Sequence, residues 1–260
     1  MAILRRIEVR RYSYGERRDQ FGELALPGGT GPFPVVVLIH GGFWRARYHL
    51  RLEDELVADL TARGFAAWNL EYRRLGFRSR GGWPATFEDV AAGIDRLGLL
   101  EESLDTARIF AVGHSAGGHL AFWAAARPGL PAGAPGAEPS IRLAGAVAQA
   151  GVVDLREAHR LGLSRGVART LMGGPPGKLP QRYDAASPIE RLPLKVPQLL
   201  VHGEADAVVP PAIARRYYER ASEAGDPCEL VMLPGVGHME HLDPTTSAWA
   251  PVVGWLEAHR

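Results

Sequence analysis

Six consecutive residues without a charged or polar side chain, Pro34 to Ile39, constrain the fold more than any other feature of the chain. This run, PVVVLI, is short, rich in β-branched residues and free of apolar–polar alternation. Such a strand is buried on both faces, which is typical of a parallel sheet covered by helices on its two sides. A helical pattern follows, with Leu52, Leu56 and Leu60 on one face ahead of Gly64. The alternation of strand and helix predicts an α/β protein with a mostly parallel sheet.

The same two patterns recur along the rest of the chain. The further strands expected in the parallel part are Ala66 to Leu70, Arg108 to Val112, Leu143 to Ala148, Val196 to His202 and Glu229 to Leu233. The further helices expected are Glu88 to Leu100, Ala116 to Ala126, Ile213 to Ala224 and Ser247 to His259. Two opening segments, Ile7 to Tyr12 and Gln20 to Leu26, are predicted to form an antiparallel hairpin.

One additional helical stretch interrupts this alternation. It runs from Leu155 to Met172 and ends in Gly173-Gly174-Pro175-Pro176. A length of 260 residues is compatible with one α/β domain. We therefore expect a single domain over residues 1–260 with a small helical cap inserted at about residues 155–176.

Charge balance and cysteine content exclude several classes of protein. The chain has 30 Lys plus Arg and 29 Asp plus Glu, whereas nucleic-acid-binding proteins need an excess of basic charge. The one cysteine, Cys228, cannot form an intrachain disulfide. Met1 to Arg18 lacks the apolar core of a signal peptide, and no segment reaches the roughly 18 apolar residues of a membrane span. We expect a soluble, cytoplasmic protein without a nucleic-acid or membrane partner, either a monomer or a homodimer.

A candidate nucleophile follows the expected strand Arg108 to Val112. The sequence continues as Gly113-His114-Ser115-Ala116-Gly117, which matches the pattern G-x-S-x-G. A serine at a tight turn between strand and helix projects its hydroxyl, and small neighbours permit the close backbone approach. The N-terminus of the following helix favours the negative charge that develops on a reacting carbonyl. Ser115 is therefore the predicted nucleophile.

A second match to the pattern serves as an internal control. Gly162-Leu163-Ser164-Arg165-Gly166 has the same spacing. The residues before it, Arg156 to Leu161, are charged and helix-like, so no strand leads into Ser164. Since the strand–turn–helix context is missing there, Ser115 is strongly favoured over Ser164.

A glycine pair after the strand Pro34 to Ile39 predicts an oxyanion hole. The segment reads His40-Gly41-Gly42-Phe43-Trp44, and its glycines leave backbone N–H groups unobstructed. Two donors aimed at one point stabilise an oxyanion. The expected donors are Gly42 and Phe43 together with Ala116, the residue after the nucleophile.

The base and the carboxylate that orients it should follow the serine in the order acid, then histidine. Asp206 lies just past the strand Val196 to His202, and His238 lies in the loop after the last strand. Histidine suits the role because it can take the serine proton and return it to the leaving group. The alternatives that remain open are His241 for the base, and Glu204 or Asp154 for the acid. His114, His119 and His202 are expected to be packed, hydrogen-bonded neighbours of the site.

With HGGFW and GHSAG in place, the chain resembles the α/β-hydrolases, and in particular the group of esterases, lipases and kynurenine formamidases. The likeness extends from His40 through Ser115 and Asp206 to His238. It implies the α/β-hydrolase fold, with an eight-stranded sheet and a triad of Ser115, Asp206 and His238. Hormone-sensitive-lipase-like enzymes have a third glycine where this chain has Phe43. The aromatic pair Phe43-Trp44 is more similar to the formamidases.

Three further residues are candidates for binding substrate. Trp44 and Trp83 follow expected strand ends and could line an apolar pocket, and Met239 adjoins the predicted base. Core packing is an equally good interpretation for these side chains. The segment His238-Met239-Glu240-His241 does not present three well-spaced ligands, so we expect no metal and no organic cofactor.

The residues together predict a serine hydrolase that works by acyl transfer on a small-molecule ester or amide. Carboxylic esters with short acyl groups are the first expectation. Arylformamides of the N-formylkynurenine type are the second, because one oxyanion hole serves esters and amides alike. A non-catalytic ligand-binding protein on a hydrolase scaffold is the alternative from another class. It is disfavoured because a binding pocket needs no ordered Ser–Asp–His set.

Overall fold

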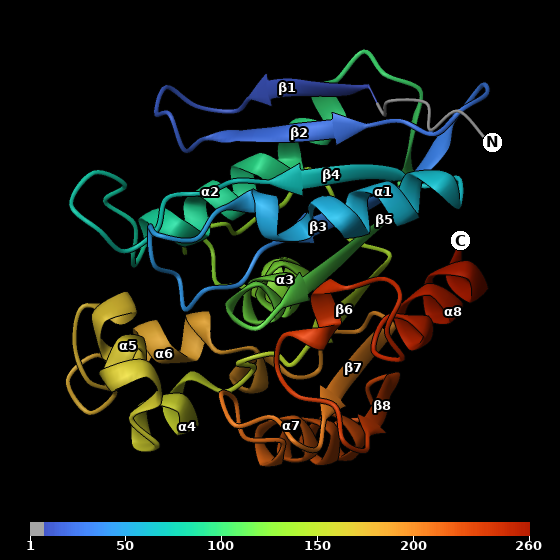
Figure 1. Cartoon of the computed structure of the whole chain (residues 1–260). Coiled ribbons are helices and arrows are strands. Elements are labelled where there is room, and N and C mark those ends of the chain that lie inside the picture. Colours follow the sequence, from blue (N-terminus) through green and yellow to red (C-terminus); the bar gives the residue numbers. More distant parts are fainter. Residues whose placement is uncertain (1–7) are drawn as a thin grey trace.

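An eight-stranded sheet in the order β1-β2-β4-β3-β5-β6-β7-β8 forms the centre of the molecule. A computed structural model describes residues 8–260 (Figure 1). The strands are β1 (Val9–Ser13), β2 (Phe21–Ala25), β3 (Phe33–Ile39), β4 (Ala66–Leu70), β5 (Leu104–His114), β6 (Gly145–Gln149), β7 (Gln198–Gly203) and β8 (Cys228–Leu233). β1 and β2 are antiparallel, and all pairs from β4 to β8 are parallel. The predicted class, a mostly parallel sheet behind an antiparallel hairpin, is confirmed.

Helices cover the sheet on both faces. They are α1 (Asp54–Ala62), α2 (Ala85–Asp95), α3 (Ala116–Ala126), α4 (Leu155–Arg160), α5 (Leu163–Met172), α6 (Pro180–Ala186), α7 (Ala212–Glu223) and α8 (Ala250–His259). α1 and α8 pack on one face, whereas α2, α3 and α7 pack on the other. In Figure 1 the helices α4, α5 and α6 form a separate group beside α3.

The central strand β3 shows why the sheet needs two cores. Val35, Val37 and Ile39 belong to the core beneath α2 and α3, and Val36 and Leu38 belong to the core beneath α1 and α8. All five side chains have 0% exposure. Since successive side chains of a strand point to opposite faces, an unbroken apolar run is what two covered faces require.

Most expected elements are present, with shifted boundaries. β4 and α3 have the bounds that the sequence predicts, and the structure supplies the hairpin of β1 and β2. Ile7, which the predicted first strand includes, lies outside the described residues. The helix predicted from Glu88 begins at Ala85 instead, where Thr86 closes the first turn by accepting from Gly82 N–H. The N-cap residue of α2 is Pro84, so the helix begins directly after a proline.

The additional helices after β6 are more numerous than predicted. The stretch from Leu155 to Met172 contains α4 and α5, as expected, but α6 follows beyond it. Ser164, Arg165 and Gly166 have positive φ angles of 44°, 61° and 74° at the start of α5, which makes a tight turn there. A single domain with its cap at about residues 155–176 stays a prediction. Within residues 8–260, each helix is too short or too polar to cross a lipid bilayer.

The same substitution at two helical glycines should have opposite effects on stability. A Cβ at Gly117, in α3, would lie 1.7 Å from the carbonyl oxygen of Ile39, so Gly117→Ala must displace backbone. We expect Gly117→Ala to lower the free energy of unfolding by about 1–3 kcal/mol or more. Gly254, inside α8, has no atom of residues 8–260 within 4 Å of the position that a Cβ would take, apart from the backbone of its own helix. Gly254→Ala should raise the free energy of unfolding by about 0.5–1 kcal/mol, because alanine favours the helix.

Urea denaturation of the two variants and the unaltered protein measures both effects. Equal effects of the two substitutions would contradict the interpretation of the α3–β3 contact.

Candidate active site

Ser115 lies at a sharp corner between β5 and α3. Its backbone has φ 56° and ψ −115°, a strained conformation for a residue other than glycine. The corner is held by a hydrogen bond from Ser115 N–H to the carbonyl of Gln149, 2.8 Å long, at the end of the neighbouring strand β6. A Cβ at Gly113 would lie 2.1 Å from the carbonyl oxygen of Gly117, so both positions need glycine. This is the strand–turn–helix context that G-x-S-x-G requires.

His238 and Asp206 form a hydrogen-bonded pair in the same region. The Nδ1–H of His238 donates to Oδ2 of Asp206 over 2.7 Å. Asp206 comes from the loop after β7, and its other oxygen accepts from the N–H groups of Val208 and Val209 at 2.8 and 2.9 Å. His238 and Ser115 line one cavity. Because Nδ1 carries the proton, Nε2 is the ring nitrogen left to accept one.

Asp206 is held in its ionised form. Burial alone would raise its pKa, but hydrogen bonds from His202, His238 and the Val209 N–H outweigh burial and hold the pKa of Asp206 below its ordinary value. The second imidazole, His202, places Nε2 at 3.2 Å from Oδ2 of Asp206 and 2.9 Å from the carbonyl of Val209. A charged carboxylate beside Nδ1 favours the tautomer of His238 with the proton on Nδ1 and can stabilise an imidazolium.

His114, the residue before the serine, contacts both the backbone and the ring of His238. Its Nε2–H donates to the backbone carbonyl of His238 over 2.8 Å, and the two rings lie 4.7 Å apart. Burial, with smaller contributions from His238 and His241, holds the pKa of His114 well below its ordinary value. His114 is therefore neutral and carries its proton on Nε2. The expectation that His114, His119 and His202 are packed, hydrogen-bonded residues agrees with their contacts.

The alternative residues make other contacts. Ser164 accepts from Arg45 through both its backbone carbonyl and its hydroxyl, at 2.8 and 3.3 Å. Asp154 caps α4 by accepting from the Glu157 N–H. Glu204 is paired with Arg215 on the surface. The ring nitrogens of His241, which has 0% exposure, have no hydrogen-bond partner in the part of the chain that the structure describes. Asp206 is thus the acid that the structure brings to His238.

The predicted oxyanion donors lie around Ser115. Gly42 and Phe43 line the same cavity as Ser115 and have positive φ angles of 105° and 50°. A Cβ at Gly42 would lie 2.3 Å from the ring of Tyr48. Ala116 is the first residue of α3, where a backbone N–H has no acceptor inside the helix. Across residues 8–260, the N–H groups of these three donors make no hydrogen bond to the protein.

A buried carboxylate anchors the loop that carries two of these donors. Oε1 of Glu71, at the end of β4, accepts from Nε2 of His40 over 3.0 Å, while Nδ1 of His40 lies 2.8 Å from the carbonyl of Gly41. Tyr72 stacks on the His40 ring at 4.5 Å and donates to the His40 carbonyl. Both glutamate and histidine are buried. The orientation of the loop that carries Gly42 and Phe43 therefore depends on a carboxyl group at the end of the neighbouring strand.

Glu71 also holds the wall of the cavity. Its Oε2 accepts from the Leu50 N–H at 3.3 Å, and its Oε1 pairs with Arg74 at 3.1 Å. Arg74 in turn donates to the carbonyl of Tyr48, a residue that lines the cavity. One carboxylate thus links the oxyanion loop to the segment opposite it.

The cavity at Ser115 is small and mostly apolar. It has a volume of about 170 Å³ and is lined by Gly42, Phe43, Tyr48, Leu52, His114, Ser115, Val208, His238 and Met239. Met239, one of the predicted substrate-binding residues, lies at the cavity and is 56% exposed. The structure shows no group of three or more His, Cys, Asp or Glu side chains suited to a metal ion among residues 8–260.

The two predicted tryptophans are not brought to the cavity. Trp44 has 0% exposure and packs edge-on against His119 in the core, with ring centres 5.2 Å apart. The ring of Trp83 packs against Phe87, and the backbone N–H of Trp83 donates to the carbonyl of Leu171. A strand end predicts where a residue lies but not which way its side chain points. The contacts of Trp44 and Trp83 agree with packing, the second interpretation that the sequence allowed, and their role in substrate binding stays a prediction.

Sequence reasoning missed the residues that complete the site. Tyr48, Leu52 and Val208 line the cavity without belonging to a motif. Glu71 also lacks a motif, and its place depends on the register of β3 on β4: Ile39 pairs with Leu70, so the residues that follow them, His40 and Glu71, leave the sheet side by side.

Comparisons with known proteins agree with this geometry. The family model BD-FAE matches residues 24–220. The probable carboxylic ester hydrolase LipM of Mycobacterium tuberculosis is 29% identical over 217 residues, which cover 80% of this chain and 50% of LipM. Esterase LipC of the same bacterium is 28% identical over 255 residues, which cover 90% of this chain and 60% of LipC. The chain thus spans about half the length of these curated relatives.

A solved structure has the same architecture. The propionate-bound form of Est2, an esterase of Thermogutta terrifontis, matches with a TM-score of 0.73 at 25% identity, over 97% of this chain and 91% of Est2. Together with the sheet described above, this likeness confirms the α/β-hydrolase fold. All three proteins named here are described as ester hydrolases, and none of them supports the formamidase grouping that Phe43-Trp44 suggested.

Removing the charge of Glu71 should slow chemistry at Ser115. In Glu71→Gln the ion pair with Arg74 is lost and the anchor of His40 is weakened, so the donors on the Gly42 loop lose their alignment. Loss of one oxyanion donor costs about 10²–10³ in rate, and we expect the second-order rate of Ser115 labelling by a fluorophosphonate to fall by about tenfold or more.

Asp95→Asn is the matched control. Asp95 also accepts from an arginine, Arg127, and from a backbone N–H, that of Ile141, but touches no residue of the cavity. Its labelling rate should stay within about twofold of the unaltered protein even where thermal stability falls. Equal slowing by both substitutions would mean that Glu71 acts only through general stability.

Proposed function

The chain belongs to the BD-FAE family, and from that membership and the geometry around Ser115 we propose that it is a serine hydrolase that cleaves carboxylic esters. One observation carries the proposal. His238, whose Nδ1–H donates to Asp206 over 2.7 Å, lines the same cavity as Ser115 and the loop with Gly42 and Phe43. A histidine oriented by a carboxylate, beside a serine on a strained corner, is an arrangement for activating a hydroxyl. The ester hydrolases among the relatives support the ester as substrate.

The first half of the reaction forms an acyl-enzyme. The Ser115 oxygen attacks the carbonyl carbon while its proton passes to Nε2 of His238, and Asp206 stabilises the imidazolium. The carbonyl oxygen becomes an oxyanion, which accepts hydrogen bonds from the N–H groups of Gly42, Phe43 and Ala116. The bond from the carbonyl carbon to the alcohol oxygen then breaks, and His238 returns the proton to the departing alcohol.

The second half restores the enzyme with water. His238 accepts a proton from a water molecule as the water oxygen attacks the acyl carbon. The same three donors hold the new oxyanion. The bond to the Ser115 oxygen breaks, His238 protonates that oxygen, and the carboxylic acid leaves. The bonds and protons of both halves are balanced by the residues named here, the ester and one water molecule.

The size of the cavity favours short acyl groups. Its volume of about 170 Å³ is below the roughly 300–1,000 Å³ typical of pockets for drug-sized ligands. Phe43, Leu52 and Val208 give it apolar walls suited to a short hydrocarbon chain. The binding of propionate by Est2 supports the same acyl size.

The choice of nucleophile is tested by two serine substitutions. Ser115→Ala should abolish fluorophosphonate labelling and lower kcat for p-nitrophenyl acetate by about 10³-fold or more, because no nucleophile remains. Ser164→Ala should leave both within about twofold, since Ser164 only accepts hydrogen bonds from Arg45.

The reverse pattern would overturn the choice of Ser115. Absence of labelling and of turnover in the unaltered protein would instead favour a ligand-binding protein on a hydrolase scaffold.

Acyl length and bond type are tested with matched substrates. For p-nitrophenyl esters from acetate to octanoate, kcat/KM should be highest at two to four acyl carbons and fall by about tenfold or more at eight, because a longer chain exceeds the cavity. N-formylkynurenine should be a poorer substrate than p-nitrophenyl acetate when the two values of kcat/KM are compared.

A higher kcat/KM for N-formylkynurenine would establish the arylformamidase alternative on the same triad. A flat response to acyl length would contradict the assignment of the cavity to the acyl group.

A further inference from the structure

Basic residues are concentrated in three segments of the chain. Residues 43–48, 73–83 and 161–183 together contain ten of the 30 basic residues and none of the 29 acidic residues. The near-neutral net charge of +1 therefore hides a strong separation of charge. A high arginine content of the whole chain would not explain why these segments lack acidic residues.

The three segments meet in space. Arg45 and Leu75 form a parallel bridge, with Ala46 N–H donating to the Leu75 carbonyl at 2.9 Å. The Arg45 guanidinium reaches the third segment through the carbonyl of Ser164, and Trp83 N–H donates to the carbonyl of Leu171 at 2.7 Å. They make one continuous surface.

This surface adjoins the catalytic cavity on the side of the oxyanion loop. Phe43 and Tyr48, which begin and end the first segment, both line the cavity. The guanidinium of Arg47 lies over the Tyr48 ring, 4.7 Å from its centre. A substrate bound at Ser115 with a group that projects past Tyr48 would meet Arg47 first.

Some of the ten cations serve the fold. Arg73 pairs with Asp89 and Arg74 with Glu71, while Arg45 donates to Ser164 and the half-buried Arg182 donates to the carbonyl of Met172. The remaining exposed cations have no ion pair within residues 8–260; we call them the basic rim, and they are Arg47, Arg78, Arg80, Arg165, Arg169 and Lys178.

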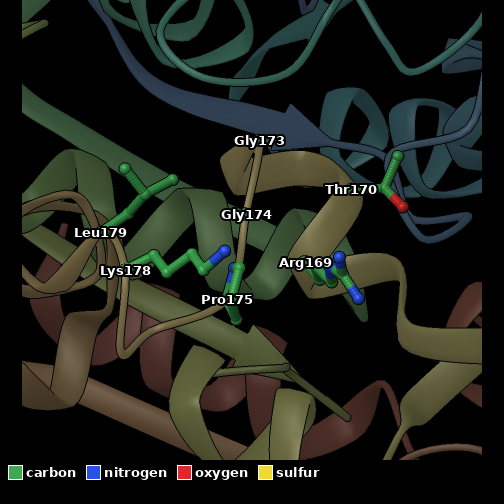
Figure 2. A pocket seen from close by; sticks show the side chains of 7 residues that line it. All are labelled: Arg169, Thr170, Gly173, Gly174, Pro175, Lys178 and Leu179. Atoms are coloured by element: carbon green, nitrogen blue, oxygen red, sulfur yellow. The ribbon is translucent and has the colours of Figure 1, made fainter.

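The far part of the basic rim is hollowed. An open cavity of about 560 Å³ is lined by Arg169, Lys178, Thr170 and the turn at Gly173–Pro175. Figure 2 shows Arg169 and Lys178 on either side of Pro175. The acidic residues that flank the third segment along the chain are each paired, Glu157 with Arg160 and Asp184 with Arg156. The rim therefore keeps its positive potential.

We propose that the basic rim selects esters whose part outside the Ser115 cavity carries a negative charge, such as a carboxylate. The proposal rests on the proposed esterase function and names its substrate class. Unpaired exposed arginines contribute little to stability, whereas a guanidinium recognises a carboxylate through two parallel hydrogen bonds. Several like charges beside a cavity also raise the local concentration of an anionic substrate.

Two substrates of equal shape test the charge directly. In para-acetoxybenzoate and para-acetoxybenzamide the acyl group is the same, and the remote group is a carboxylate or a neutral amide. At low ionic strength we expect kcat/KM to be about tenfold higher for the benzoate. The ratio should approach one in about 1 M NaCl, where the Debye length is about 3 Å.

Variants locate the effect. The combined substitution Arg47→Gln, Arg165→Gln and Arg169→Gln should bring the ratio of the two kcat/KM values to about one, with the value for the benzamide within about twofold of the unaltered enzyme. Arg142→Gln is the control, since Arg142 is exposed and unpaired among the described residues but precedes β6, at the opposite end of the strands.

The proposal is overturned by a ratio of one or less in the unaltered enzyme, or by an equal effect of Arg142→Gln. Hydrolysis of the benzamide with labelling at Ser115 would show in that case that the esterase function stands and only the charge selection fails. Loss of hydrolysis of both substrates, together with absent labelling, would overturn both proposals.

Discussion

The close contact between the first turn of α3 and the ends of β3 and β5 is the constraint on which the site depends. Gly117 lies so near the Ile39 carbonyl, and Gly113 so near the Gly117 carbonyl, that neither position has room for a Cβ. This contact places the serine corner of β5 beside the loop that leaves β3. The N–H groups of that loop and of Ala116 can therefore surround one point without any rearrangement of the backbone, which is the preorganisation that oxyanion stabilisation needs.

Two buried carboxylates, Asp206 and Glu71, orient the other parts of the site. Asp206 lies between β7 and α7 and is saturated by two imidazoles and two backbone N–H groups. Glu71 lies after β4 and is saturated by His40, Arg74 and two backbone N–H groups. A charge in the interior is tolerated only when it is paired and hydrogen-bonded. Each carboxylate therefore orients its surroundings: Asp206 orients His238, the proposed base, and Glu71 orients the loop with the proposed oxyanion donors Gly42 and Phe43.

A residue of the site could be predicted from the sequence when the residues that define its place are close to it along the chain. Ser115 and the Gly42 loop belong to contiguous motifs, and the strand patterns locate the ends of β3, β5 and β7, so these residues could be placed from the sequence. Glu71 could not, because its partners come from the register of β3 on β4. The sequence left Trp44 open between core and cavity because a loop can turn a side chain into either. α6 was missed because a seven-residue helix beginning at Pro180 gives almost no periodic signal.

The charged surface residues near the site differ between the two parts of the sheet that carry its loops. The base and its carboxylate come from the loops after β7 and β8, where the surface cations near Asp206 are paired, as Arg215 is with Glu204. The loop with the proposed oxyanion donors follows β3, and there the neighbouring segments carry cations that form no ion pair within residues 8–260. A positive potential on that side acts in the same direction as the N-terminus of α3, because both favour negative charge near Ser115. Because the exposed cations lie outside the cavity and act through solvent, their effect on a neutral ester is small, whereas an anionic ester gains in encounter and in binding.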